Sequence, residues 1–372
     1  MPDIHETVLE IDLGALEHNY RFLRSRIKPS TKFMAVVKAS GYGSDALAIA
    51  NKLVSLGIDA LAVAYASEGI ALREGGIRCP ILVLHPQVGN FDEIIAYEME
   101  PSLYSARILK GFHQAARKAA QEGYPVHLKF NTGLNRLGFW ETDVRFIKEE
   151  IDASGALKIK GILSHLGASE DLDEKEFTQR QIALFSKIVE EVERSLGPIP
   201  LKHLLNTSGI LNYPEAQWDM VRSGIGVYGY GNDPRFDPEL RPVVSLKTVI
   251  SQLHRIEPGE TVGYNRAYRA DGHRTTATLP LGHADGIGRQ YGQGKASVLV
   301  QGNQAPIIGN VCMDMLMIDV TGIDCKEGDE VILFGEGQSA DQFASYAGTI
   351  SYELLTGIAT RVKRIYKDPN PL

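Results

Sequence analysis

The chain has 372 residues, more than one ordinary hydrophobic core organises, so we expect two domains or a barrel of about 250 residues with an addition. Hydrophobic residues make up 44% and charged residues 23%, and a net charge of −7 gives no support for a nucleic-acid partner. The three widely spaced cysteines indicate neither a disulfide framework nor a metal site, and no apolar run or basic leader suggests a membrane, so the cytoplasm is the expected location.

Short apolar runs alternate with longer segments of helical periodicity from about residue 32 to residue 230. The runs have the length and composition of buried strands, and the segments between them are long enough for a helix. Eight strands separated by helices predict an α/β fold, a (β/α)8 TIM-type barrel. The expected strands cover residues 33–37, 60–64, 81–84, 101–104, 126–130, 159–163, 201–205 and about 220–222.

The residue pattern changes at residues 231–238, where two prolines and several turn-forming residues indicate a domain boundary. Beyond it, short β-rich runs and tight turns predict a C-terminal, mostly β domain with antiparallel strands. We therefore expect a barrel at 13–233 and a β domain at 234–372, with an N-terminal strand within 1–12 that packs on the β domain.

Polar residues follow several of the expected strands at the point where each strand ends. Lys38 follows MAVV, His165 follows GILS, Asn206 follows KHLL, and Arg222 follows DMV. Each residue alone is more often a solvated or structural side chain. Because chemistry in such barrels lies at the C-terminal ends of the strands, their convergence predicts a functional site.

The segment around Lys38 favours covalent chemistry with an aldehyde. A buried apolar strand delivers this lysine into the barrel mouth, and Gly41 and Gly43 permit a tight turn after it. Desolvation there disfavours the ammonium form, which Schiff-base chemistry requires. The small residues of the loops at 206–209 and 223–226 leave backbone N–H groups available to a phosphate.

Nine segments, in order along nearly the whole chain, resemble those of the alanine racemases. No single segment would be specific, but their order and spacing are. In the barrel they are VVKASGYG, LKFNTGLNRLGF, GILSHLGASE, NTSGIL and VRSGIGVYGYG; in the β domain they are VGYNRAYRADG, LGHADGIGR, IIGNVCMDMLMIDV and SYELLTGIATR.

The resemblance implies racemisation of alanine with pyridoxal 5'-phosphate by a two-base mechanism. Lys38 would bind the cofactor covalently and act as one base, and Tyr264 would be the base on the opposite face. In the family this tyrosine comes from the partner subunit, which implies a homodimer with shared active sites. The resemblance also implies a role in D-alanine biosynthesis for peptidoglycan precursors, although the sequence leaves a catabolic role open.

Further roles are carried over position by position. Arg222 would contact the pyridine nitrogen and His165 would hold Arg222, while Arg136 and the partner's Met313 would contact the substrate carboxylate. Lys129 matches a lysine that is often carbamylated, and Asp314 adjoins Met313 with an ordinary turn role equally open. The remaining cofactor-binding positions are Tyr42, Asn206, Thr207, Gly224, Ile225 and Tyr352.

The sequence departs from the family pattern at a few positions near these motifs. Ser40 and Gly41 stand where asparagine and alanine are usual, and Asn131 replaces a common aspartate. His283 replaces a tyrosine that narrows the entrance to the site, which puts strict alanine specificity in doubt.

Other functions remain to be weighed against this one. A broad-specificity or serine racemase keeps the same architecture, and a non-catalytic pyridoxal-phosphate carrier would need only a lone barrel. A related decarboxylase would want an acidic residue in place of Arg222. A metal-dependent barrel enzyme would need His and carboxylate clusters at strand ends, where only His165 is so placed.

Overall fold

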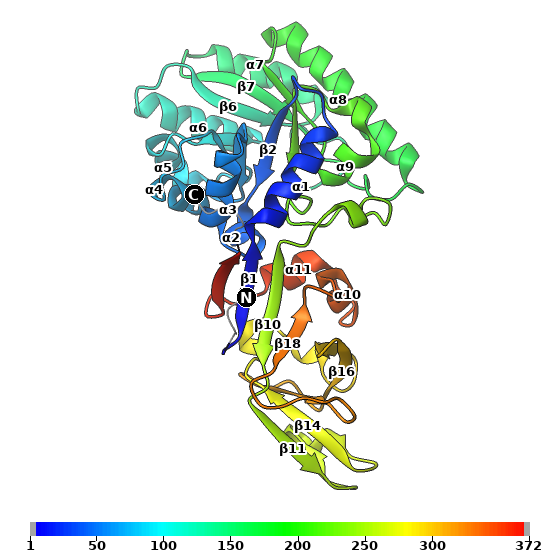
Figure 1. Cartoon of the computed structure of the whole chain (residues 1–372). Coiled ribbons are helices and arrows are strands. Elements are labelled where there is room, and N and C mark those ends of the chain that lie inside the picture. Colours follow the sequence, from blue (N-terminus) through cyan, green and yellow to red (C-terminus); the bar gives the residue numbers. More distant parts are fainter. Residues whose placement is uncertain (1–4, 368–372) are drawn as a thin grey trace. The chain divides into compact units, whose positions relative to one another are not determined.

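The computed structural model describes residues 5–367 and divides the chain into two compact units (Figure 1). Among the described residues, the barrel unit comprises 15–41 and 46–241, and the β unit comprises 5–14, 42–45 and 242–367. This division differs from the expected limits at 13–14, 42–45 and 234–241.

Two hydrogen-bond clusters account for the differences at 42–45 and 234–241. In the β unit the guanidinium of Arg364 donates to the carbonyl oxygens of Gly43 (2.8 Å) and Ser44 (3.1 Å). In the barrel unit the Asn19 side chain accepts from the backbone N–H of Arg241 at 2.8 Å and donates to its carbonyl at 2.7 Å. These bonds attach residues 42–45 to the β unit and the end of segment 234–241 to the barrel unit. The composition of the two segments does not predict either attachment.

The barrel unit contains a closed barrel of eight parallel strands, which confirms the predicted fold class. The strands β2 and β9 close it with Lys32 opposite Met220. The strands are β2 (Lys32–Val36), β3 (Ala60–Val63), β4 (Ile81–Val83), β5 (Glu100–Leu103), β6 (Tyr124–Lys129), β7 (Leu157–Leu163), β8 (Leu201–His203) and β9 (Met220–Ser223).

The strand β8 ends two residues earlier than the sequence predicts, whereas β2, β3, β4, β5 and β6 each end one residue earlier. The apolar run at 201–205 continues past β8, but Leu205 has left the ladder with β7, and its carbonyl accepts from the backbone N–H of Arg222 at 3.0 Å. The chain then turns into α9, with Asn206 as the N-terminal cap. Apolar composition continues through this turn because Leu204 and Leu205 are both fully buried.

Helices surround the barrel strands (Figure 1). The helix α6 illustrates why they form, because Ser105 caps its N-terminus and Ile108, Leu109 and Phe112 recur at helical spacing on the buried side. The helices of this region are α1 (Leu13–Ser25), α3 (Ala46–Ser55), α4 (Ala66–Glu74), α5 (Phe91–Ala96), α6 (Ala106–Lys118), α7 (Val144–Asp152), α8 (Lys175–Leu196) and α9 (Thr207–Asn212).

The β unit is built on a nine-stranded sheet in the order β11-β14-β17-β16-β15-β18-β10-β1-β19. Its neighbouring strands are antiparallel except for β1 and β19, which run parallel. The strands are β1 (Val8–Asp12), β10 (Val244–Val249), β11 (Gln252–Ile256), β14 (Arg274–Leu279), β15 (Ser297–Val300), β16 (Asn303–Ile308), β17 (Leu316–Asp319), β18 (Glu330–Phe334) and β19 (Lys363–Lys367).

Smaller elements complete the β unit. A short ribbon pairs β12 (Thr261–Val262) with β13 (Tyr268–Arg269), and the helices α10 (Ala340–Ser345) and α11 (Ser351–Thr356) lie between β18 and β19 along the chain. The core includes Tyr291 stacked on Phe343 with ring centroids 4.7 Å apart. Over residues 5–367, no helix is long and apolar enough to cross a bilayer, and no cluster of three potential metal ligands is present.

Candidate active site

A left-handed turn follows the strand that carries Lys38. The helix α2 (Lys38–Tyr42) has positive φ at Ala39 (52°), Ser40 (55°), Gly41 (66°) and Tyr42 (53°). Each residue with a Cβ costs roughly 1–2 kcal/mol in this conformation. Glu68 holds the turn by accepting the backbone N–H of Ala39 at 2.6 Å, and such stored strain is typical of functional sites.

Gly43 continues this turn in the β unit with φ 79°, and its identity has a packing reason. An added Cβ would lie 1.9 Å from the carbonyl oxygen of Leu355, so only glycine permits this approach. The approach accompanies a contact between Tyr42 and Tyr352, whose ring centroids are 6.1 Å apart. Burial, and then the neighbouring Tyr352, raise the pKa of Tyr42, so the Tyr42 phenol is a neutral hydrogen-bonding group.

Lys38 and Lys129 lie among cationic groups at the C-terminal end of the barrel. Burial and then Arg136 lower the pKa of Lys38, and Glu68 opposes this. Burial, followed by Arg136, Arg222 and Lys38, lowers the pKa of Lys129 to about 8. The arrangement attracts anions and gives both lysines access to the neutral amine form, which is the nucleophilic and basic form.

Arg222, the third residue of β9, is 4% exposed and fully engaged at both terminal nitrogens. Its Nη1 donates to the His203 carbonyl at 2.8 Å and lies 3.0 Å from His203 Nδ1. Its Nη2 donates to the Ser164 carbonyl at 2.6 Å and lies 3.4 Å from His165 Nδ1. Burial lowers the pKa of Arg222 to about 10, so the guanidinium remains charged at neutral pH.

His165 faces this charge as a neutral ring. Burial and then Arg222 lower its pKa well below the usual value, so Nδ1 can accept a hydrogen bond from Arg222. The structure therefore brings Lys38, His165 and Arg222 together at one end of the barrel. The three residues are close enough that the charges of Arg222 and Lys38 both lower the pKa of His165.

The two loops expected to hold phosphate touch each other. Thr207 Oγ1 lies 2.9 Å from Ser223 Oγ and accepts the backbone N–H of Gly226 at 3.2 Å. An added Cβ at Gly226 would lie 2.5 Å from Thr207 Cγ2. Within residues 5–367, the backbone N–H groups of the buried Gly224 and Ile225 have no acceptor, and buried N–H groups without acceptors indicate a ligand or water.

Asn206 uses its side-chain oxygen inside the protein. This oxygen accepts from the backbone N–H of Gly209 and from the Ser169 hydroxyl, both at 2.8 Å. The side chain thus caps α9 and orders the loop that carries Thr207.

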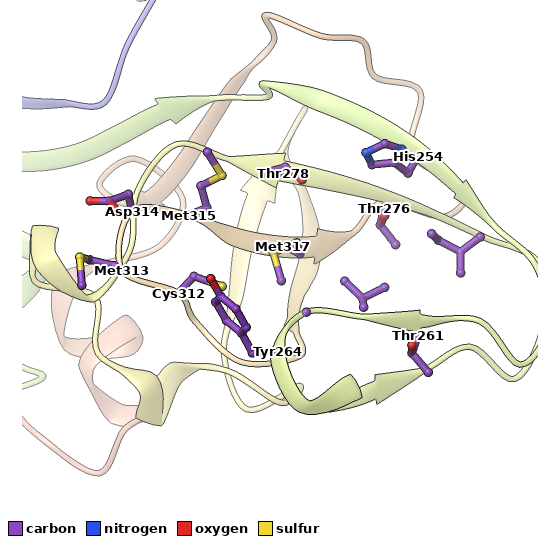
Figure 2. A pocket seen from close by; sticks show the side chains of 13 residues that line it. His254, Thr261, Tyr264, Thr276, Thr278, Cys312, Met313, Asp314, Met315 and Met317 are labelled. Atoms are coloured by element: carbon purple, nitrogen blue, oxygen red, sulfur yellow. The ribbon is translucent and has the colours of Figure 1, made fainter.

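The β unit carries the other predicted site residues on its loops. Tyr264 follows Gly263, which has φ 76°, and its side chain is 74% exposed. Asn310 holds the segment by donating from Nδ2 to the Tyr264 carbonyl at 3.0 Å. Tyr264 and Met313 both line a hollow of about 550 Å³ (Figure 2), together with His254, Ile256, Thr261, Val262, Gly263, Thr276, Thr278, Cys312, Asp314, Met315 and Met317.

The loop at 312–315 is held at fixed points while Met313 stays 59% exposed. The exposed His283 donates its backbone N–H to the Cys312 carbonyl at 2.9 Å. Asp314 accepts from Arg361 Nη2 at 2.6 Å, and Arg361 also bonds Asp285 at 2.7 Å. The carboxylate of Asp314 therefore has a structural partner that accounts for its position.

Known proteins match the chain from end to end. A family model described as alanine racemase, N-terminal domain, matches residues 11–232, and one described as alanine racemase, C-terminal domain, matches residues 243–366. The chain belongs to the alanine racemase family. It is therefore an amino-acid isomerase with the activity of an alanine racemase.

Individual relatives agree with this assignment. The alanine racemase of Clostridium novyi is 37% identical, covering 96% of this chain and 94% of its own length. The alanine racemase of Clostridium difficile 630 superposes with a TM-score of 0.92 at 33% identity, covering 99% of this chain and 97% of that one. That of Bartonella henselae, solved with covalently bound pyridoxal phosphate, gives 0.89 at 28% identity, with 98% and 100% coverage.

Two residues that contact the candidate site, Glu68 and His203, are not predicted by the sequence analysis. Glu68 accepts a hydrogen bond from the turn after Lys38, but it lies in α4, and no sequence motif links it to that turn. His203 is the histidine of the KHLL run that precedes Asn206, yet the run by itself does not single it out. A histidine two residues before the end of an apolar run could have been found by asking which strand residues face inward.

Proposed function

We propose that this racemase interconverts L-alanine and D-alanine with pyridoxal 5'-phosphate held through Lys38, and that Lys38 and Tyr264 are the two bases. The observation that carries the proposal is the placement of Lys38 directly before a strained turn, half-buried, with its pKa lowered by burial and by Arg136. An amine with a lowered pKa condenses with an aldehyde and accepts a proton more readily near neutral pH.

The surrounding donors fit the cofactor's other groups. The buried N–H groups of Gly224 and Ile225, with Thr207, suit a phosphate, and Tyr42 and Tyr352 offer two phenols for it. The charged Arg222 suits the ring nitrogen. When bound, pyridoxal phosphate acidifies the Cα proton of an amino acid.

The chain's own groups then move and hold protons. We assign Lys38 Nζ to one face of the substrate Cα and the Tyr264 phenol to the other, because inversion requires a proton to leave one face and return on the opposite one. Arg222 has no proton to release at neutral pH, so it leaves the ring nitrogen unprotonated. A neutral ring withdraws less charge, which disfavours side reactions. His165 would keep Arg222 in place.

Binding of the substrate carboxylate falls to Arg136 and Met313 in this proposal. A guanidinium fork matches a carboxylate with two parallel hydrogen bonds. We also propose that Lys129 is carbamylated and orients Arg136; a pKa of about 8 supports this, because only the neutral amine reacts with CO₂. A native intact-mass spectrum without the CO₂ adduct would count against the carbamate.

We propose that the active enzyme is a homodimer in which Tyr264 and Met313 serve the partner's barrel. Their side chains, and that of Met315, are 74%, 59% and 51% exposed, and clustered exposed apolar groups are typical of interfaces. Mixing Lys38→Ala with Tyr264→Ala subunits should regenerate one competent site per heterodimer. No recovery after verified subunit exchange would contradict shared sites.

Reduction with borohydride followed by peptide mapping tests the cofactor assignment. We expect a pyridoxyl mass on the peptide that contains Lys38 and on no other lysine peptide. Lys32 on the exposed side of the same strand is an internal control, because it lies only six residues away. Turnover by protein free of pyridoxal phosphate would contradict the proposal.

A broader substrate range is favoured by one position, the exposed His283, whose backbone N–H bonds the Cys312 carbonyl beside Met313. A panel of L-amino acids that includes serine distinguishes this from strict alanine specificity.

For the cellular role, we propose cytoplasmic supply of D-alanine to peptidoglycan precursors on the basis of family membership. Growth of a deletion strain without added D-alanine would argue for a catabolic role instead.

A further inference from the structure

A chain of five polar side chains runs through the inside of the barrel from β9 to β7. Arg222 Nη1 lies 3.0 Å from His203 Nδ1, and His203 Nε2 lies 3.1 Å from His127 Nδ1. His127 Nε2 lies 2.8 Å from Glu100 Oε2, and Lys160 Nζ lies 2.5 Å from Glu100 Oε1. Both histidines are fully buried, and the proposed proton transfers use neither of them.

The donor and the acceptor of every contact follow from Arg222. Its nitrogens can only donate, so His203 Nδ1 must accept and the His203 proton lies on Nε2. That N–H donates to His127 Nδ1, which places the His127 proton on Nε2, and this second N–H donates to the Glu100 carboxylate. All contacts are then satisfied in one direction, from the guanidinium to the carboxylate.

The opposite direction leaves a buried conflict. If His127 carried a proton on Nδ1, this N–H would donate to His203 Nε2. The proton of His203 would then lie on Nδ1, facing the Nη1 of Arg222 at 3.0 Å. Two donors would oppose each other where no water can intervene, because His203 is fully buried and Arg222 is 4% exposed.

The barrel is shaped to accommodate this chain. Gly161 of β7 lies between β6 and β8, and an added Cβ there would be 2.4 Å from His127 Nδ1. The ladder between β6 and β7 shifts register at Val126 and His127, beside this glycine. Burial raises the pKa of Glu100, but the hydrogen bonds from His127 and Lys160, together with the ammonium charge of Lys160, outweigh it and hold the pKa below its usual value. Glu100 is thus an acceptor only.

We infer that Glu100, His127 and His203 are positioning residues, which orient Arg222 toward the cofactor by presenting a fixed lone pair to its Nη1. The inference rests on the proposed function, since it assumes that Arg222 serves the ring nitrogen of pyridoxal phosphate. The Glu100 carboxylate accepts on one side of the two rings and the Arg222 guanidinium donates on the other, so both groups favour the same pair of tautomers.

The tautomers can be measured directly in the holoenzyme by ¹⁵N NMR of labelled histidine, assigned with His127→Asn and His203→Asn variants. We expect both rings to be neutral and protonated on Nε2 at pH 7 to 8. A proton on Nδ1 of His203, or a doubly protonated His127, would overturn the inference. This measurement does not depend on catalysis, so it remains decisive if the cofactor assignment fails.

Glu100→Gln tests the functional consequence. In this variant the Lys160 ammonium should donate to the amide oxygen, which turns the amide NH₂ toward His127. His127 Nε2 must then accept, so both rings change tautomer. We expect the His203 proton to move to Nδ1, the absorption band of the bound cofactor to shift, and kcat to fall about tenfold or more, with KM changing much less. Unchanged tautomers, absorption and kcat in the folded variant would overturn the inference.

Lys160→Met is the matched control. Its side chain is one-third exposed, and without it Glu100 still accepts from His127, so the tautomers, the absorption band and kcat should stay near wild type. In Glu100→Gln with Lys160→Met the amide oxygen is free to face His127. This double variant should regain the original tautomers and most of kcat. Failure to regain them, with Lys160→Met itself near wild type, would mean that loss of the carboxylate rather than reversal of the chain causes the defect.

Discussion

Glu68 Oε1 accepts the backbone N–H of Ala39 at 2.6 Å, which attaches α4 to the left-handed turn that follows Lys38. The other carboxylate oxygen accepts the backbone N–H of Ala64 at 2.7 Å. One side chain therefore supports both the end of a barrel strand and the strained segment beside the proposed cofactor lysine.

Replacing Glu68 with alanine should destabilise the protein by about 1–3 kcal/mol, because three backbone donors, those of Ala39, Ala64 and Tyr65, lose a charged acceptor. Urea denaturation followed by far-UV circular dichroism measures the change. Glu93→Ala is the control, since Glu93 lies in the first turn of α5 and is exposed. Equal losses in the two variants would show that Glu68 acts only through the end of its helix.

Ser40→Gly should stabilise the folded protein by about 0.5–1 kcal/mol, because relief of the left-handed strain exceeds the added entropy of the unfolded chain. Ser186→Gly in the right-handed helix α8 should instead destabilise it by several tenths of a kcal/mol. Thermal and urea unfolding of both variants provide the comparison. A loss of stability in Ser40→Gly would contradict the positive φ of 55° at this position.

The buried His203 predicts a loss of stability in acid. Burial, and then Arg222, hold its folded pKa well below the usual value, so the unfolded chain binds a proton that the folded protein does not. Stability should therefore fall by about 1.4 kcal/mol per pH unit from this residue as the pH drops below about 6.5. Unfolding free energies at pH 7.5, 6.0 and 5.0 measure the slope, and His203→Asn should reduce it. An unchanged slope would mean that His203 is protonated in the folded state.

Tyr264→Phe should lower racemisation about 10²–10⁴-fold, the usual contribution of a positioned acid or base. Exchange of the Cα proton with solvent should be lost asymmetrically between L-alanine and D-alanine, because only one face loses its base. Folding stability should hardly change, since the side chain is 74% exposed. Tyr346→Phe, at an exposed tyrosine outside the predicted site, is the control; equal loss of exchange for both enantiomers would contradict two bases.

His283→Tyr should narrow the substrate range, because it places a bulkier ring beside the loop that carries Met313. The expected result is a lower ratio of serine to alanine turnover with little change in alanine turnover itself. A matched substitution at the exposed Arg269, Arg269→Tyr, should leave the ratio unaltered. If the ratio does not move in His283→Tyr, the histidine has no part in selecting the substrate.

The sequence by itself determined the fold class and part of the candidate site. Alternating strand and helix patterns predict a closed parallel barrel, and in such a barrel all strands end at the same rim. That topology alone is enough to bring together residues as distant in sequence as Lys38, His165 and Arg222, whichever register the strands adopt. The nine ordered segments added the family, which the family models confirm.

Only the tertiary structure decided how those residues are supported. The positive φ values after Lys38 are imposed by contacts such as that with Glu68, which local preferences do not encode. The chain from Glu100 to His203 depends on a register shift at His127 and on the space left by Gly161. Side chains inside a barrel meet across strands far apart in sequence, so a shift of one residue changes which of them touch, and sequence periodicity carries no information about that shift.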